Sequence, residues 1–171
     1  MSSRSAHRLT WSLVAGTLLL AGAARADSDR LLPMQVPKAY TQECGACHTA
    51  YPPGLLPAPS WQRIMTGLDK HYGTDASLDA ATVQQLNTWL QAHAGTYKRV
   101  NEVPPEDRIT RSAWFVREHR KIDAAVWSHA SVKSAANCAA CHTRADQGDF
   151  DDDNLRIPSG LDARYHRAFR D

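Results

Sequence analysis

Cysteine is absent from this 171-residue chain except in two short motifs, and that excludes a disulfide-based scaffold. All four cysteines lie in two copies of Cys-x-x-Cys-His, at residues 44–48 and 138–142. Methionine is also rare, and beyond the N-terminal segment only Met34 and Met65 remain. Strand signals, such as short runs of alternating apolar and polar residues, are missing throughout. The chain is therefore predicted to be all-α.

Long apolar runs are missing too, apart from one near the N-terminus. The basic residues Arg4 and Arg8 precede a charge-free stretch of 14 residues, Trp11–Ala24, and Ala24-Arg25-Ala26 supplies a small-x-small cleavage site. A membrane span needs about 20 apolar residues, so we prefer a cleaved signal peptide, residues 1–26, to a retained anchor. The expected destination is the periplasm or an equivalent compartment outside the cytoplasmic membrane.

The chain without its predicted signal peptide also lacks a large net charge of either sign. The loss of Arg4, Arg8 and Arg25 with the signal leaves 17 basic residues against 18 acidic ones, a formal charge of −1. Nothing in this balance suggests binding to nucleic acid. The acidic run formed by Asp149 and residues 151–153 is either solvated surface or a docking patch for a redox partner.

What the chain does have is the two Cys-x-x-Cys-His motifs, which are typical of covalent c-type haem attachment. The thiol pair adds to the two vinyl groups of one haem, and the adjacent imidazole ligates the iron from one face. Thiol redox chemistry or zinc binding would explain one copy, but two copies that use every cysteine favour two covalently bound haem c groups. The predicted attachment residues are Cys44, Cys47, Cys138 and Cys141, with His48 and His142 as iron ligands.

The attachment motifs start 94 residues apart, so each half of the chain has its own haem. A polar, proline-containing stretch from Tyr97 to Asp107 suggests a break. We expect a haem domain at residues 27–103 and a C-terminal segment at 104–171 that holds the second haem.

The first half predicts three helices. The first covers Tyr40 to His48, and a proline-rich loop follows it. The second begins at an N-cap Ser60 and ends near Lys70, and the third begins at Ser77 or Asp79 and ends near His93. The second helix has an apolar stripe at Trp61, Ile64, Met65 and Leu68, and the third has one at Val83, Leu86 and Leu90.

The sixth ligand of each iron decides the chemistry, because a thioether or an open position would change the potential or admit small molecules. Met65 belongs to an apolar stripe and is expected to pack in the core, and Met34 is a weak candidate. Histidines are better supplied. For the first haem the candidates are His71 and His93; for the second they are His119, His129 and His166.

The chain resembles the dihaem cytochrome c (DHC) family of small bacterial electron carriers. The first half carries the resemblance at Tyr51-Pro52-Pro53, Ser60-Trp61 and His71 to Leu78. The second half carries it at Arg108-Ile109-Thr110, Trp114-Phe115, His119, Ser134 to Asn137, Ala145, Gln147 to Phe150 and Arg156-Ile157-Pro158.

This resemblance implies two bis-histidine haems, with His71 as the distal ligand of the first and His119 as that of the second. It also implies an N-terminal cytochrome c-like domain and a loop-rich helical C-terminal segment that wraps around it. The implied function is periplasmic electron transfer without enzymatic activity or a small-molecule substrate. Expected partners are a membrane cytochrome b or quinol-linked donor and a small haem protein as acceptor.

Two other functions remain open at this point. A haem enzyme or sensor would keep one open or labile iron site for oxygen, nitric oxide or peroxide. A docking subunit of a larger membrane complex would have the same motifs.

Overall fold

The computed structural model describes residues 31–95, 100 and 102–170. The predicted signal peptide and part of the predicted break between Tyr97 and Asp107 lie outside these residues. Five α-helices are described, joined by loops and short 3₁₀ turns: α1 (Lys38–Glu43), α2 (Ala58–Thr66), α3 (Ala80–His93), α4 (Ala113–Glu118) and α5 (Ala124–Ser128). The same residues form no strand, only isolated bridges between His71 and Thr74 and between His142 and Leu155. The predicted all-α class is confirmed.

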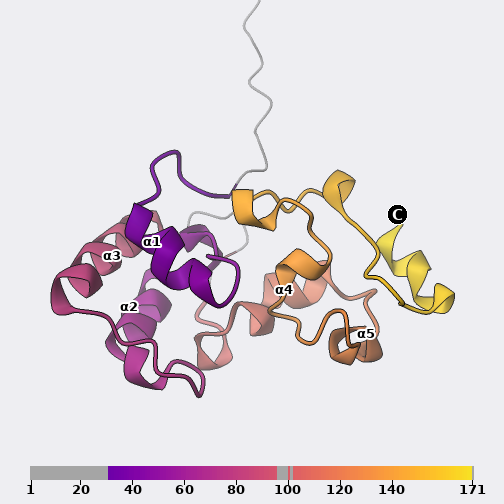
Figure 1. The fold of residues 1–171 in the computed structure, drawn as a ribbon, viewed down its shortest axis with the longest axis horizontal. Helices are drawn as coiled ribbons and strands as arrows, with labels where there is room; N and C mark the ends of the chain where they lie inside the picture. Colours follow the sequence, from indigo (N-terminus) through magenta and orange to yellow (C-terminus); the bar gives the residue numbers. More distant parts are fainter. Residues whose placement is uncertain (1–30, 96–99, 101, 171) are drawn as a thin grey trace, which may run out of the picture.

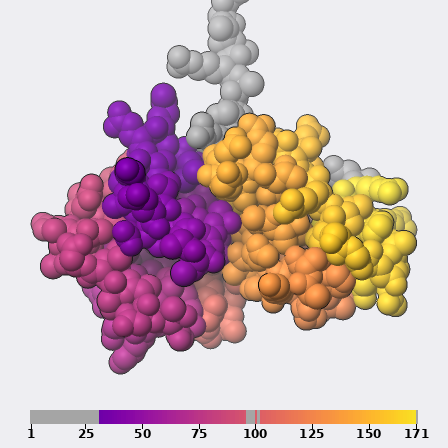
Figure 2. All heavy atoms as spheres, in the orientation of Figure 1, coloured from indigo at the N-terminus to yellow at the C-terminus, as the bar shows by residue number. Residues whose placement is uncertain are grey.

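The helices α1, α2 and α3 lie together on one side of an elongated molecule, and the chain after α4 lies mainly beside them (Figure 1). The backbone N–H of Leu31 donates to the carbonyl of Gly148 at 2.7 Å, so the start of the described chain is tied to the second half. In the space-filling view the two halves meet directly (Figure 2). The predicted wrapping of the C-terminal segment stays a prediction. None of the helices in the described ranges has the length and hydrophobicity of a membrane span.

The start of α2 differs from the prediction. The N-cap is Pro57, not Ser60, and Pro59 lies within the first turn, where a proline costs no intrahelical hydrogen bond. Ser60 is instead fully buried inside the helix. Trp61 and Met65 of the predicted apolar stripe are buried, but α2 ends at Thr66, before the predicted end near Lys70, so Leu68 lies in the 3₁₀ turn Leu68–Lys70 that follows. Met65 therefore packs in the core, as expected.

The third predicted helix is confirmed with its cap. The Asp79 carboxylate accepts hydrogen bonds from the backbone N–H groups of Ala81 and Thr82, both at 3.0 Å. It thereby satisfies donors that the first turn leaves without intrahelical partners. Leu86 and Leu90 on the inner face are completely buried.

The main core takes residues from both sides of the predicted boundary at 103/104. Tyr40, Leu56 and Leu86 from the first half pack in one cluster with Trp114 and Phe115 of α4. A smaller cluster forms around Val126, Val132, Ala140 and Leu161 in the second half. Helix α4, together with Ile109 of the preceding 3₁₀ turn, therefore brings the second half into the main core, although the boundary itself stays a prediction.

Candidate haem-binding sites

The first attachment motif begins where α1 ends. A 3₁₀ turn, η1 (Cys44–Ala46), continues from α1 and carries Cys44, while Cys47 follows it as its C-cap. Cys44 is half-buried and Cys47 is exposed. The His48 ring stacks on the Tyr51 ring with centroids 4.7 Å apart, and its Nδ1–H donates to the Thr49 carbonyl at 2.7 Å. That hydrogen bond leaves Nε2 of His48 for a metal.

The structure places His71 opposite His48. His71 ends the 3₁₀ turn η3 (Leu68–Lys70), which follows α2. The centroids of the two imidazole rings are 6.2 Å apart, and the ring planes are inclined by only 23°. The two predicted ligands of the first haem thus form a nearly parallel pair.

The second motif is built on a 3₁₀ turn, η6 (Cys138–Ala140). Its backbone is fastened by Arg156, whose guanidinium donates to the carbonyls of Ala139 and Ala140 at 2.6 and 3.2 Å. The Arg156 backbone N–H also donates to the Cys141 carbonyl at 2.8 Å. These bonds hold the loop between the two thiols in one conformation.

His119, the predicted distal ligand of the second haem, is the C-cap of α4. Its ring stacks on Phe115, one helical turn earlier, with centroids 4.0 Å apart, and its Nδ1–H donates to the Phe115 carbonyl at 2.9 Å. The ring of His142 lies 6.2 Å from it, inclined by 78°. The second pair is therefore nearly perpendicular.

The spacing of both pairs fits an iron between the rings. A metal–imidazole bond is about 2 Å long, and a five-membered ring with C–N bonds of about 1.33 Å has its centre about 1.1 Å from each atom. Two imidazoles on opposite sides of one iron would then have centroids about 6.2 Å apart. Both pairs show this separation, 6.2 Å.

Burial favours the neutral, metal-binding form of three of the imidazoles, those of His71, His119 and His142. It lowers the pKa of His71 and of His119, and it lowers the pKa of His142 to about 4. In the absence of thioether bonds, burial raises the pKa of Cys44 and of Cys138 to about 11. Before attachment these two thiols are therefore protonated at neutral pH.

The other three candidate histidines are hydrogen-bonded to residues close to them in the sequence. His93 donates to the Trp89 carbonyl at 2.8 Å, His129 pairs with the Ser131 hydroxyl at 2.8 Å, and His166 pairs with the Leu161 carbonyl at 3.0 Å. Within the described chain, none of these rings contacts His48 or His142. Met34 is fully exposed. The geometry therefore favours His71 and His119, although iron ligation by them stays a prediction.

A contact that the sequence did not reveal joins the two halves. The Tyr51 hydroxyl donates to the carbonyl of Ala136 at 2.7 Å, across 85 residues, and the Tyr51 carbonyl accepts from the Tyr40 hydroxyl. Because the Tyr51 ring also stacks on His48, one side chain connects the predicted iron ligand His48 to the segment before Cys138. The Tyr-Pro-Pro sequence marks the position, but no local signal identifies so distant a partner.

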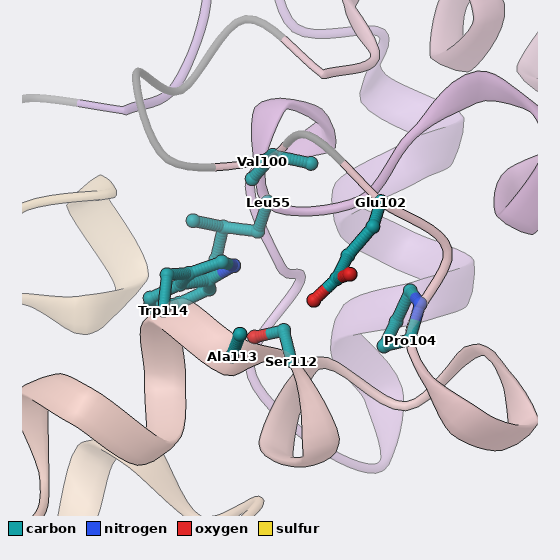
Figure 3. A pocket seen from close by; sticks show the side chains of 7 residues that line it. All are labelled: Leu55, Val100, Glu102, Pro104, Ser112, Ala113 and Trp114. Atoms are coloured by element: carbon teal, nitrogen blue, oxygen red, sulfur yellow. The ribbon is translucent and has the colours of Figure 1, made fainter.

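A small pocket lies at another junction between the halves (Figure 3). Leu55 from the first half and Trp114 from α4 form one side, and the Glu102 carboxylate points toward Ser112 and Ala113. Its lining includes none of the eight predicted haem-binding residues. It lies between the two halves and is separate from both imidazole pairs.

An all-α chain with two Cys-x-x-Cys-His motifs, each facing a second imidazole, defines the class of dihaem c-type cytochromes. The chain belongs to the dihaem cytochrome c family, whose model matches residues 40–150. Membership implies two covalently bound c-type haems.

Solved structures agree with this assignment. The diheme c-type cytochrome of Shewanella baltica OS155 is 36% identical with a TM-score of 0.63, over 72% of this chain and 96% of that one. The diheme cytochrome c of Rhodobacter sphaeroides is 37% identical with a TM-score of 0.61, over 70% of this chain and 99% of that one. A search among curated proteins gives no significant match.

Proposed function

We propose that this protein carries electrons, one per haem, through two bis-histidine low-spin haems in the periplasm. The observation that carries the proposal is the second imidazole facing each attachment motif, His71 opposite His48 and His119 opposite His142, at the same centroid separation of 6.2 Å. Electron transfer without catalysis follows from a site whose two axial positions are both occupied by protein.

The residues around each pair suit this role. Haem supplies a metal that changes its charge by one electron. The protein holds the ligands on short, hydrogen-bonded segments, so that little has to move when the charge changes. The Phe115 carbonyl orients His119 and the Thr49 carbonyl orients His48, and such hydrogen bonds also raise the basicity of a ligating imidazole.

The test is low-temperature electron paramagnetic resonance (EPR) of the oxidised holoprotein, alone and with His71→Met or His119→Met. Two low-spin bis-imidazole signals are expected in the unmodified protein, and each substitution should remove one of them. His93→Met is the matched control and should leave both signals unchanged. A high-spin signal in the unmodified protein would contradict the proposal.

The alternative, a haem enzyme or sensor, predicts a site that binds small ligands. A carbon monoxide titration of the reduced protein separates the two functions. A carrier with four imidazole ligands should show no change in its haem absorption, whereas an open or labile iron binds the gas at one haem. Spectral change in the unmodified protein would favour the alternative.

Location and partners belong to the same proposal. The apolar segment ahead of Ala26 supports export, which N-terminal sequencing of the periplasmic protein would test. As donor we propose a membrane cytochrome b or quinol-linked protein, and as acceptor a small haem protein.

The acidic run at Asp149 and residues 151–153 is exposed in part. Charge reversal there should reduce the rate of association with a basic partner at low ionic strength.

A further inference from the structure

The His71 side chain is presented by a tight turn with unusual backbone angles. The N–H of Thr74 donates to the His71 carbonyl at 3.0 Å, and the two central residues, Tyr72 and Gly73, have φ angles of 51° and 96°. Positive φ at both central positions is typical of a type I′ turn, which favours glycine or asparagine. A tyrosine there is strained and needs support from its surroundings.

The support comes from a second strained segment. The Tyr72 hydroxyl is shared between the carbonyls of Glu106 and Asp107, at 3.1 Å from each. Glu106 and Asp107 themselves have φ angles of 57° and 54°. Of the four non-glycine residues with positive φ in the described ranges, three therefore meet in this one contact, and the fourth is Lys133. Strain of this kind persists only where surrounding contacts maintain it, and it concentrates at functional sites.

Two arginines stabilise the contact between Tyr72 and residues 106–107. The Arg108 guanidinium carbon lies 4.2 Å from the centroid of the Tyr72 ring, a cation–π arrangement. From α2, Arg63 donates to both carboxylate oxygens of Asp107, at 2.8 and 2.6 Å, in the bidentate geometry that fixes a carboxylate best. The segment that holds Tyr72 is thus itself held against the helix that leads to His71.

Of the two predicted distal ligands, His71 depends more on its turn than His119 does. His48 and His119 each donate Nδ1–H to a backbone carbonyl, whereas among the described residues the His71 ring has no hydrogen-bond partner, and neither has Nδ1 of His142, which follows directly on the Cys138–Cys141 turn. Its described ring contacts are with His48 and, edge-on at 4.9 Å, with Tyr72. The orientation of the His71 ring is therefore set by the backbone turn and by Tyr72.

We propose that Tyr72 and Arg108 act as a clamp that positions His71 and thereby keeps the first haem six-coordinate. This inference rests on the proposed bis-histidine ligation. Arg108, and the Glu106 and Asp107 carbonyls that hold the Tyr72 hydroxyl, lie beyond the predicted boundary at 103/104. The second half of the chain thus contributes to whether the first iron is closed or accessible. Tyr72 and Arg108 are positioning residues, since they act on the iron only through His71.

The test compares the reduced holoproteins of Tyr72→Phe/Arg108→Gln, Arg108→Gln and Arg111→Gln. Arg111 is the matched control, because it pairs with Glu106 at 2.5 Å but makes no described contact with Tyr72. Carbon monoxide should bind one haem of two in the double variant and a smaller fraction in Arg108→Gln, and neither haem in Arg111→Gln. In the oxidised double variant the EPR signal that His71→Met removes should weaken, while the second signal stays. Arg108→Lys, which keeps a cation near the ring, should restore part of the signal.

Unchanged EPR signals and no carbon monoxide binding in the double variant would overturn the proposal, even if its thermal stability fell, because the clamp would then be only structural. If the double variant loses haem, Arg108→Gln alone decides by the same two measurements. If the unmodified protein already binds carbon monoxide, the bis-histidine proposal fails instead, and the two failures are thereby distinguished.

Discussion

The two imidazole pairs differ most in the angle between their rings, 23° for His48 and His71 against 78° for His119 and His142. In the proposed bis-histidine haems, each imidazole would interact most strongly with the iron d orbital that lies perpendicular to its ring plane. Parallel rings act on the same orbital and separate it in energy from its partner, whereas perpendicular rings leave the two orbitals nearly equal. The haems should therefore be spectroscopically distinct.

We predict a rhombic low-spin EPR signal from the first haem and a strongly anisotropic, low-field signal from the second. Phe115→Leu removes the ring that stacks on His119 at 4.0 Å, so it should shift the second signal alone. Trp89→Leu, a large aromatic substitution beside His93, is the control and should leave both signals in place. Two rhombic signals in the unmodified protein would contradict the predicted ring orientation.

At the scale of the elements, helix α4 contributes both to the main core and to the second predicted haem site, because its aromatic residues are buried and His119 is its C-cap. Its N-cap is Ser112, which is buried. The Ser112 hydroxyl accepts from the Phe115 N–H at 3.3 Å and donates to the Ile109 carbonyl at 2.7 Å. One side chain therefore satisfies a donor of the helix and an acceptor of the preceding turn.

Ser112→Ala should lower the free energy of unfolding by about 1–2 kcal/mol, because it removes a cap and leaves the Ile109 carbonyl without this donor. Denaturant unfolding of the holoprotein measures the change. Ser128→Ala removes an exposed hydroxyl that donates to the Ala125 carbonyl at 3.2 Å, and it should change stability much less. Equal effects of the two substitutions would argue against a special role for the α4 cap.

The 3₁₀ turn η4 (Pro105–Asp107) is linked to α2 by an ion pair that depends on pH. The hydrogen bonds from Arg63 hold the pKa of Asp107 below its ordinary value. The stability that this pair contributes is therefore fully present above the unfolded-state pKa of about 3.9 and is lost as the pH falls through the lower folded-state value.

Asp107→Asn should consequently destabilise the protein at pH 7 and have little effect once the pH is low enough to protonate Asp107 in the folded protein. Thermal unfolding of the variant and of the unmodified protein, measured from pH 7 to pH 2, gives two curves of unfolding temperature against pH. These two curves should converge at the acid end. Asp69→Asn, a substitution at an exposed carboxylate in η3, serves as control and should lower the unfolding temperature at pH 7 much less than Asp107→Asn does. A constant difference for Asp107→Asn across the range would contradict the linkage.

At the scale of the whole molecule, the two haem-binding halves are joined by a shared core and by a few specific hydrogen bonds. The hydrogen bond from Tyr51 to Ala136 lies beside both motifs, since Tyr51 stacks on His48 and Ala136 comes two residues before Cys138. Burial raises the pKa of Tyr51 well above its ordinary value, so the hydroxyl remains a donor at neutral and moderately alkaline pH.

Tyr51→Phe keeps the stacked ring and removes only this hydrogen bond. It should lower the free energy of unfolding by about 1 kcal/mol, and hydrogen exchange should show faster opening of the segment around residue 136. Thr41→Val, which removes an exposed hydroxyl bonded to the Lys38 carbonyl at 2.9 Å, is the control. Unchanged exchange near residue 136 would show that this hydrogen bond does not contribute to holding the halves together.

Local patterns predicted the parts of this protein that depend on neighbouring residues. The spacing within Cys44–His48 and Cys138–His142 identifies the attachment sites, because one haem must reach residues four positions apart. A start of α3 at Ser77 or Asp79 and the burial of Met65 also follow from short-range sequence, and the structure shows Asp79 to be the cap. The start of α2 was predicted wrongly, because Ser60 has the chemistry of a cap but is buried, and the prolines begin the helix earlier.

By itself the sequence determined an all-α chain with two haem-attachment sites, and family resemblance selected His71 and His119 from five candidate histidines. Only the tertiary structure decided that each of these two lies 6.2 Å from an attachment histidine, and that Tyr51 and Tyr72 each reach into the other half of the chain. The physical reason is that such contacts arise when distant segments are buried against one another, and no spacing along the chain specifies which backbone carbonyl or ring will then be near.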